Sequence, residues 1–391
     1  MERWGSDGRG EVGQGRAPLR IAIITGSRSD WNGLGMVGRA LEAAGEEVFV
    51  VVTGQHCEDA QTLIDERWQH WLFASPDASG PITKIAGRVA DRVGTALVEL
   101  KPDMAVMAGD RYEVLSAALS ASLLGIPIVH IAGGDVTEGS QDDRFRDGIT
   151  ALACVHCATS EYALSRLMQR THHDDYAVVT GSPAIDRIKA TPVLSARETY
   201  ERFGLSVGKH EIIVSVHPNT VGGDPMLECR VLLAALNDLG EGFNFACLGA
   251  NADVGGDRIN AALEAFCIQH PGSVFRGNVS PQLYYSLLTH CDCMVGNSSA
   301  AYYEAPSFGI PCVDIAPRQR GRLVPENVGN VAADRELIVR SIRWSLANRG
   351  HSPVPNPYGD GQSAPRIVKA IQDNAWRCKR GASSAQKRET V

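Results

Sequence analysis

Residues 101–150 read KPDMAVMAGDRYEVLSAALSASLLGIPIVHIAGGDVTEGSQDDRFRDGIT. The apolar run at 104–108 ends in Gly-Asp-Arg, a helix-like segment follows, and a second apolar run at 126–132 ends in Gly-Gly-Asp. This pattern predicts two parallel strands joined by a helix, and ligands bind beyond the carboxyl ends of such strands. We therefore expect acid–base chemistry at this edge of the sheet, from four aspartates: Asp110, Asp135, Asp142 and Asp143.

Strand-like and helix-like segments alternate through the rest of the chain. The first half predicts further strands at 19–25, 47–53, 154–160 and 176–181, and helices at 34–44 and 81–100. After residue 209 the pattern restarts, with strands expected at 212–216, 243–248, 274–276, 293–295 and 312–315, and helices at 226–239 and 257–270. Such alternation indicates parallel sheets covered by helices on both faces. The predicted fold class is α/β, with two doubly wound Rossmann-like domains that face each other across a cleft.

The expected domain boundaries follow changes in composition and periodicity. Residues 1–18 and 379–391 are polar or charged and are expected to be disordered tails. Residues 19–185 form the expected first domain, which carries the acid–base residues, and 209–360 form the second. Weak apolar periodicity and two prolines make 186–208 the expected linker. A final helix within 361–378 is expected to pack back on the first domain.

Composition excludes several classes of protein. With 38 Lys and Arg against 45 Asp and Glu, the net charge is −7, so the chain lacks the basic face that nucleic acid requires. No apolar run reaches the roughly 20 residues that span a membrane, and the first 20 residues contain no apolar core of a secretory signal. The 10 cysteines are scattered, many within apolar runs, which favours free thiols in the cytoplasm over disulfides. Neither close cysteine pair, 154 with 157 or 291 with 293, has the second pair of a metal site.

Three features of the second half predict an anion site opposite the aspartates. His217 follows the strand at 212–216, at the edge that faces the cleft. Gly-Asn-Ser-Ser at 296–299 ends one strand and opens a helix, where hydroxyls and free N–H groups bind anions. Guanidinium groups follow the next strand, and a carboxylate one turn into the helix could bind a sugar diol. These residues are Asn297, Ser298, Ser299, Glu304, Arg318 and Arg322, with Arg28 on the opposite wall.

Each of these residues also has a structural interpretation. Asp110 could cap the following helix, Asp135 could form a turn, and the pair at 142–143 could be a solvated helix start. A single histidine is more often structural than functional, and Glu304 could compensate the helix dipole. Their joint placement at the edges of two sheets favours the functional interpretation. Phosphate on one wall and acid–base chemistry on the other suggest a nucleotide-diphosphate sugar as substrate.

Four motifs resemble those of the hydrolysing UDP-N-acetylglucosamine 2-epimerase family, whose branches feed sialic and legionaminic acid pathways. They are AGDRYE at 108–113, HIAGGDVTEGSQDD at 130–143, VHPNT at 216–220 and GNSSAAYYEAPSFGIPCVDIAPRQRGR at 296–322. The resemblance spans roughly 19–375 and implies the glycosyltransferase-B fold. It further implies a UDP-sugar substrate, no cofactor, no metal and, since relatives are often dimeric, a homodimer.

The resemblance implies a two-step reaction. A base removes the proton from the carbon that bears the acetamido group, and UDP leaves to form a glycal. Water then adds with inverted configuration and gives the free 2-epimeric sugar. Carboxylates suit the proton transfers, and cations with helix N–H groups suit the departing diphosphate. The resemblance places Asp110, Asp135, Asp142, Asp143 and His217 at catalytic positions, and Arg28, Arg111, Arg146, Asn297, Ser298, Ser299, Glu304, Arg318 and Arg322 at substrate- or UDP-binding positions.

The sequence departs from the family pattern at three positions. Ala132 stands where the sialic-acid branch has a glutamate, Asp135 replaces a glutamate, and Asp147 follows Arg146 where the family usually has histidine. The legionaminic-type branch also lacks the first glutamate. The expected activity is therefore a hydrolysing 2-epimerase acting on UDP-GlcNAc, with the same chemistry, or plain hydrolysis, on a 2,4-diacetamido-2,4,6-trideoxy UDP-sugar as the alternative. A glycosyltransferase and a non-catalytic UDP-sugar binder are two further alternatives.

Overall fold

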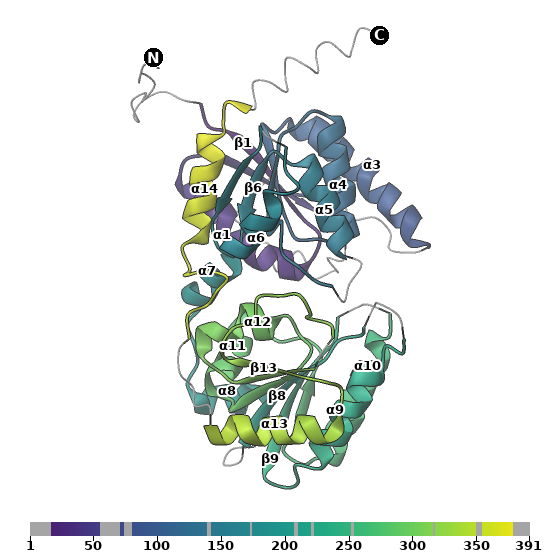
Figure 1. Ribbon diagram of the computed structural model, residues 1–391. Helices are drawn as coiled ribbons and strands as arrows, with labels where there is room; N and C mark the ends of the chain where they lie inside the picture. The colour runs from purple at the N-terminus through teal and green to yellow at the C-terminus, as the bar shows by residue number, and fades with distance from the viewer. Residues whose placement is uncertain are drawn as a thin grey trace.

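The computed structural model describes residues 17–54, 71–73, 80–138, 142–172, 174–206, 210–219, 223–251, 254–315, 317–348 and 354–377. The side chains of 28, 29 and 71–73 lie outside this description. The tails expected to be disordered fall almost entirely outside the described residues. Within them the chain forms two halves, each a parallel sheet with helices on both faces (Figure 1).

The first half contains a seven-stranded parallel sheet in the order β3-β2-β1-β4-β5-β6-β7. Its strands are β1 (Arg20–Thr25), β2 (Glu47–Val52), β3 (Trp71–Phe73), β4 (Met104–Ala108), β5 (Ile128–Ile131), β6 (Val155–Ala158) and β7 (Tyr176–Val179). The helices that follow these strands are α1 (Arg28–Ala43), α3 (Ile82–Leu100), α4 (Tyr112–Leu123), α5 (Asp142–Leu152) and α6 (Glu161–Leu167). The strand order reverses between β1 and β4, and a crevice opens at such a reversal.

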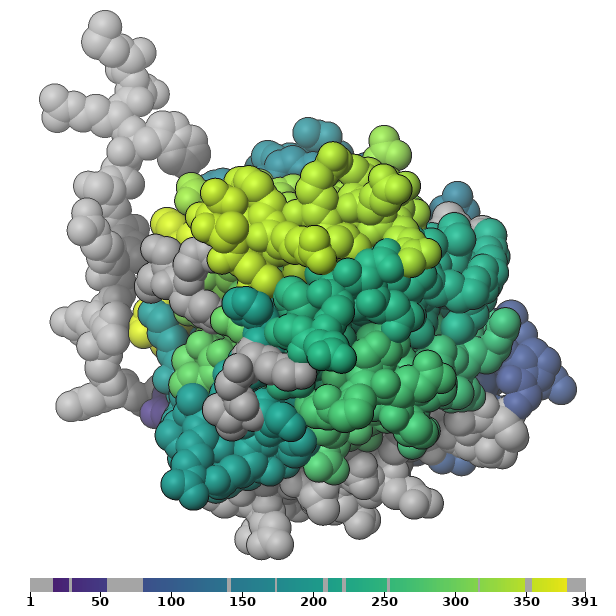
Figure 2. Space-filling model, turned by 90° about the horizontal axis from the view of Figure 1, so that it is seen from below, coloured from purple at the N-terminus to yellow at the C-terminus, as the bar shows by residue number. Residues whose placement is uncertain are grey.

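The second half contains a six-stranded parallel sheet in the order β10-β9-β8-β11-β12-β13. Its strands are β8 (His210–Ser215), β9 (Phe243–Leu248), β10 (Val274–Arg276), β11 (Cys293–Gly296), β12 (Cys312–Ile315) and β13 (Val328–Val331). Its helices are α9 (Leu227–Asn237), α10 (Gly256–Gln269), α11 (Pro281–His290), α12 (Ala300–Tyr303), the 3-10 helix η1 (Ala305–Phe308) and α13 (Arg335–Asn348). Figure 2, which shows the molecule from below, has the yellow-green atoms of α13 next to the teal and green atoms of the same half.

The segment expected as a linker is mostly helical. Residues Pro183–Ala190 form α7 and Ala196–Phe203 form α8. A capping box explains α8, because the Ser195 side chain accepts from the Glu198 backbone N–H and the Glu198 side chain accepts in return. The apolar periodicity is weak because these helices are only eight residues long. Two edge strands, β3 and β13, were not predicted. Strand β3 has only three residues, and β13 includes glycine and asparagine, which are uncommon in strands.

Helix α14 (Ser363–Asp373) returns from the second half and lies along the first (Figure 1). Its Ile367 and Ile371 side chains are fully buried in the cluster that also contains residues of β1, β4 and α1. The Asp186 carboxylate in α7 accepts from the backbone N–H groups of Ser363 and Ala364, at 3.0 Å each, and so caps the helix. The chain therefore crosses between the halves twice. No helix in the described part of the chain is long and apolar enough to cross a membrane.

Ile367→Ala is expected to lower the free energy of unfolding of the first half by about 2–5 kcal/mol, because a fully buried isoleucine leaves a cavity. Lys369→Ala on the exposed face of the same helix serves as control and is expected to change stability by about 0.5 kcal/mol or less. Urea denaturation followed by circular dichroism measures both. Equal losses in the two variants would contradict the packing of α14 described above.

Candidate active site

A buried guanidinium brings the predicted aspartates together. Arg146, in α5, is 3% exposed and forms ion pairs with the carboxylates of Asp110 and Asp143. Its guanidinium also donates to the backbone oxygen of Asp135 at 2.5 Å and to the Thr137 hydroxyl at 3.0 Å. Three of the four predicted aspartates therefore converge on one cation. Asp142 begins α5 and lies next to this group in the chain.

Asp110 remains ionised in this environment. Burial acts to raise its pKa, but Arg146, followed by Arg322 and Arg111, outweighs burial and lowers the pKa below the ordinary value of 3.8. The neighbouring Gly109 has a φ of +89°, and its backbone oxygen lies 2.9 Å from Nε2 of His130. Burial lowers the pKa of His130 to about 3, so this ring stays neutral and supports the turn before Asp110. Its position within the strand gave no sequence signal for this role.

Asp135 has the opposite electrostatic character. Its carboxylate accepts from the Thr159 hydroxyl at 2.5 Å through one oxygen and from the Tyr303 hydroxyl through the other. Burial raises the pKa of Asp135, and Arg146 only partly offsets this effect. Two carboxyl groups beside one arginine therefore have pKa values displaced in opposite directions, as acid and base pairs of active sites do.

Both carboxyl groups line a cavity of about 230 Å³. Its other polar walls are Asp30, Arg146, Ser182, Tyr303 and Arg322, and its apolar walls include Ala108, Ile131, Ala132, Pro183 and Ala184. Ala132 has a φ of +65°, a conformation that L residues rarely adopt, so the position at which the sialic-acid branch is expected to have a glutamate is a strained turn at the cavity wall. The cavity lies at the reversal of strand order between β1 and β4.

Asp30 is a cavity residue that the sequence analysis missed. It lies in the first turn of α1, where an acid has an ordinary explanation as a partner of the helix dipole. Its Oδ2 atom is buried and has no hydrogen-bond partner among the residues that the structure describes. Burial raises the pKa of Asp30 from 3.8 to about 7, against the opposing effects of Ser27 and Arg111. The GSRSD turn at 26–30 was the available sequence signal, but from it we predicted Arg28 as a site residue and not Asp30. The side chain of Arg28 lies outside the described structure.

His217 lies apart from the carboxylate cavity. Its Nδ1 accepts from the backbone N–H of Asn251 at 3.1 Å, which places the ring proton on Nε2. Burial, with a smaller contribution from Arg318, lowers the pKa of His217 to about 3. The residue is therefore neutral at physiological pH and offers a hydrogen-bond donor. It is not among the residues that line the cavity of about 230 Å³.

Asn297 stays a predicted binding residue, and its side chain also has a structural role. Its side chain is fully buried, and Oδ1 accepts from the His217 N–H at 2.7 Å while Nδ2 donates to the His217 oxygen at 2.9 Å. Both ends of the amide are thus used to join the carboxyl ends of β8 and β11. Asn297 therefore positions the backbone of His217.

The predicted helix at the anion site is short. Helix α12 has only four residues, so its dipole is weaker than expected, and Ser299 makes no side-chain cap. The Ser298 hydroxyl accepts from the Ala300 N–H at 3.4 Å. Glu304 lies at the end of α12, where burial raises the pKa of its carboxyl to about 7 despite hydrogen bonds from Tyr284 and Tyr285. Nη1 of Arg318 lies 3.5 Å from the backbone oxygen of Asn297.

Arg322 reaches the aspartates from the second half, and Arg111 acts on Asp110 and Asp30 from the first. The Arg322 guanidinium donates to the Thr137 hydroxyl at 3.0 Å and lies 5.1 Å from the centre of the Tyr303 ring. Arg111 precedes α4, and its Nε lies 3.4 Å from the Glu113 carboxylate. A basic residue of the loop after β12 therefore completes the site.

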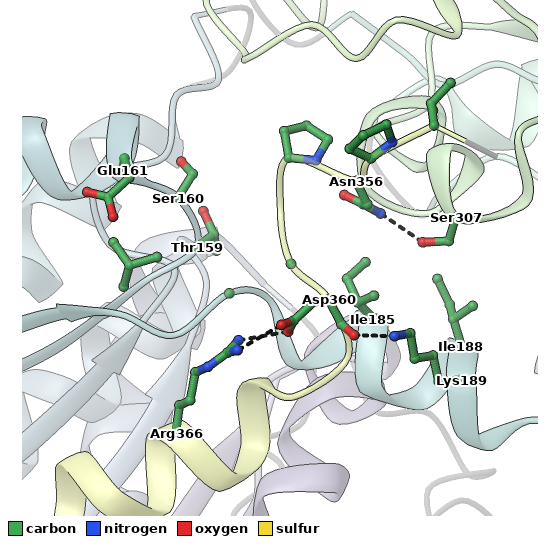
Figure 3. A pocket seen from close by; sticks show the side chains of 16 residues that line it. Thr159, Ser160, Glu161, Ile185, Ile188, Lys189, Ser307, Asn356, Asp360 and Arg366 are labelled. Carbon is green, nitrogen blue, oxygen red and sulfur yellow. Dashed lines mark hydrogen bonds and ion pairs between the residues drawn. The ribbon is translucent and has the colours of Figure 1, made fainter.

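A larger cavity, of about 590 Å³, lies behind the carboxylates where the chain crosses between the halves. Figure 3 shows Thr159 and Ser160 on one side and the returning segment with Asn356 and Asp360 on the other. The Asp360 carboxylate pairs with Arg366 at 2.7 Å. Thr159 connects the two cavities, because it lines this one and donates to Asp135 in the other.

Asp30→Asn removes a carboxyl group that holds its proton more tightly in the folded protein than in the unfolded chain. Stability of the wild type should therefore fall as pH rises from about 4 to about 7, by at most about 1.4 kcal/mol for each pH unit between the two pKa values. The variant lacks this dependence, so its stability advantage over the wild type should grow between pH 5 and pH 8. Thermal unfolding across this range tests the expectation; a constant difference between the two proteins would contradict the raised pKa.

The chain is similar in sequence to known proteins of one family. A model of the UDP-N-acetylglucosamine 2-epimerase family matches residues 39–372. The GDP/UDP-N,N'-diacetylbacillosamine 2-epimerase (hydrolyzing) of Campylobacter jejuni is 31% identical over 321 residues, which cover 79% of this chain and 83% of the relative. The UDP-N-acetylglucosamine 2-epimerase of Neisseria meningitidis serogroup B is 28% identical over 380 residues, 94% of this chain and 98% of the relative.

Solved structures with a similar fold have the same family name. The crystal structure of the UDP-GlcNAc 2-epimerase from Neisseria meningitidis bound to UDP-GlcNAc superposes with a TM-score of 0.78 at 18% identity, over 91% of this chain and 100% of that chain. This confirms the predicted fold, two Rossmann-like halves of the glycosyltransferase-B type. Because the family model matches most of its length, the chain belongs to the UDP-N-acetylglucosamine 2-epimerase family.

Proposed function

We propose that the protein is a hydrolysing 2-epimerase that converts a UDP-2-acetamido sugar into UDP and the free 2-epimeric sugar. The observation that carries this proposal is the pair of carboxyl groups in one cavity, one held ionised beside Arg146 and one with a raised pKa. Inversion at a carbon needs a base to remove a proton from one face and an acid to return it to the other. The cavity supplies one group of each kind.

In the first step, Asp110 accepts the proton from C2 of the sugar, and the bond between C1 and the UDP oxygen breaks. The electron pair of the C2–H bond forms the double bond of the glycal, and UDP carries away its own bonding pair. In the second step, Asp135 returns a proton to C2 from the opposite face while water adds its oxygen to C1. The proton that water loses restores the proton of Asp135, and Asp110 releases the proton taken from C2 to solvent. Asp143 pairs with the same Arg146 as Asp110 and takes no part in the proton transfers of this scheme.

UDP would bind on the second half. Ser298 and Ser299 follow β11, Arg318 and Arg322 follow β12, and the donor Nε2–H of His217 lies at the end of β8. These ends meet at the reversal of strand order between β8 and β11. Cations and N–H or O–H donors there would stabilise the diphosphate as it departs. Glu304 would accept from the ribose hydroxyls.

UDP-GlcNAc is the first substrate to test, and a UDP-2,4-diacetamido-2,4,6-trideoxyhexose is the second candidate. Two observations favour the second. The Campylobacter jejuni relative is named for a diacetylated sugar. The cavity wall formed by Ile131, Ala132, Pro183 and Ala184 is apolar and would suit a methyl group in place of a hydroxymethyl group.

Proton NMR in deuterated water tests the reaction directly. With either UDP-sugar, the expected products are UDP and the free 2-epimer carrying deuterium at C2. Epimerised sugar still attached to UDP would instead indicate a non-hydrolysing epimerase. Transfer of the sugar to an acceptor, with none released into water, would indicate a glycosyltransferase. Failure with both substrates and a panel of related UDP-sugars would overturn the proposal.

Asp110→Asn is expected to reduce UDP release by at least about 100-fold, because an amide cannot accept the C2 proton. UDP binding should stay within about threefold of wild type, since the proposed UDP site is on the other half. A coupled assay for UDP and calorimetric titration with UDP measure the two quantities. Asp91→Asn on the exposed face of α3 is the control and should behave as wild type. Unchanged turnover in Asp110→Asn would remove this residue from the mechanism.

A further inference from the structure

Tyr303 connects the two halves at the acid–base site. It ends α12 in the second half, yet its hydroxyl donates to the Asp135 carboxylate of the first half. The residue also lines the carboxylate cavity. Sequence analysis assigned no role to this tyrosine, which stands within the motif at 296–322.

The second half holds the Tyr303 ring firmly. Its centre lies 4.0 Å from that of Tyr358 on one side, in a stacked arrangement, and 5.1 Å from the Arg322 guanidinium. The Asn356 amide donates to the Tyr303 backbone oxygen at 2.7 Å and to the Ser307 hydroxyl at 2.8 Å. Figure 3 shows the second of these bonds, which ties the returning segment to η1. The hydroxyl therefore moves with the second half as a rigid part of it.

Among the described residues of the first half, one side chain donates to the other oxygen of Asp135, that of Thr159 at 2.5 Å. If the halves separate, the hydroxyl of Tyr303 leaves and one carboxylate oxygen loses its donor. Other contacts across the cleft are close to this one. The Glu138 N–H donates to the Arg320 oxygen at 3.3 Å, and Arg322 donates to Thr137 at 3.0 Å.

We propose that Tyr303 is a positioning residue that makes Asp135 competent for proton transfer only when the two halves are closed on the substrate. This inference rests on the proposed function and extends it. Its physical basis is that a carboxyl group at a domain boundary receives one of its two hydrogen bonds from each side. The return of a proton to C2 is thereby coupled to closure, so the glycal is converted to the free sugar only where the cavity is assembled.

The charged and titratable groups that face Asp135 determine how the hydrogen bond from Tyr303 changes the pKa of Asp135. They are Arg146 from α5, Tyr303 from α12, Arg322 from the loop after β12 and Tyr358 from the returning segment. Donation by Tyr303 stabilises the ionised carboxylate and lowers the pKa of Asp135, although burial keeps that pKa raised overall. Loss of the hydroxyl should therefore raise the pKa further.

Tyr303→Phe tests the inference, because it keeps the ring and removes the hydroxyl. The expected result is a fall in kcat of about tenfold, with KM within about twofold, and a move of the limb of the pH profile that reports Asp135 to higher pH by about one unit. Tyr302→Phe is the matched control. The hydroxyl of Tyr302 donates to Asp314 at 2.9 Å within the second half, so its loss should leave the pH profile in place.

A double-mutant cycle with Asp135→Asn completes the design. In the Asp135→Asn background, Tyr303→Phe should have no further effect on turnover, since the two residues act as one unit. Additive effects, or a pH profile of Tyr303→Phe identical to that of wild type, would overturn the inference. A failure of the inference can be distinguished from a failure of the proposed function. If the protein is a hydrolysing epimerase, wild type and Tyr302→Phe must both release UDP, whatever the result for Tyr303→Phe.

Discussion

The ionic group centred on Arg146 is the interaction on which the site depends. A guanidinium that is 3% exposed must be neutralised within the protein, since an unpaired buried charge destabilises a fold by several kcal/mol. Carboxylates that follow β4 and begin α5 supply this neutralisation, and the backbone oxygen of Asp135 supplies a further acceptor. The arrangement holds two segments, 109–111 and 132–138, against one helix. The stability of this region and the geometry of the proposed active site therefore depend on the same side chain.

The same arginine separates the electrostatic roles of the carboxyl groups. Asp110 pairs with it directly and stays ionised, whereas Asp135 presents its backbone oxygen to it and keeps its side chain for neutral donors. A shared cation can thus produce one basic and one acidic carboxyl group a short distance apart. Asp30 adds a third carboxyl group, whose buried Oδ2 has no hydrogen-bond partner within the described part of the chain. The cavity thus has three carboxyl groups in its wall, which suits the proton transfers of the proposed reaction.

The second half contributes both the proposed anion site and part of the acid–base site. Its strands β8 and β11 end at His217 and Asn297, which bind each other through backbone and amide groups. Tyr303 and Arg322 extend from the same edge and reach the first half at Asp135 and Thr137. The returning segment and α14 then fasten the second half to the first through Asn356 and the buried isoleucines. The cleft is therefore an assembled site, in which neither half holds all the groups that line the cavity.

Local sequence patterns determined the α/β class, nearly all the strands and the convergence of Asp110, Asp135 and Asp143. Those inferences succeed because parallel strands are buried apolar runs and their carboxyl ends meet at one edge. The helical nature of α7 and α8 was missed because two short helices leave little periodicity. The hydrogen bonds between Asn297 and the backbone of His217 were not predicted, because sequence cannot tell whether an amide at a strand end faces the cleft or the backbone.

Other features were decided only by the tertiary structure. The ion pairs of Arg146, the raised pKa of Asp30 and the contact between Tyr303 and Asp135 depend on burial and on distances between segments far apart in the chain. Tyr303 and Asp135 are 168 residues apart, and no local pattern relates them. The sequence therefore specified which chemical groups would gather at the sheet edges. The packing of the two halves decided which of these groups are paired, which are neutral and which act together.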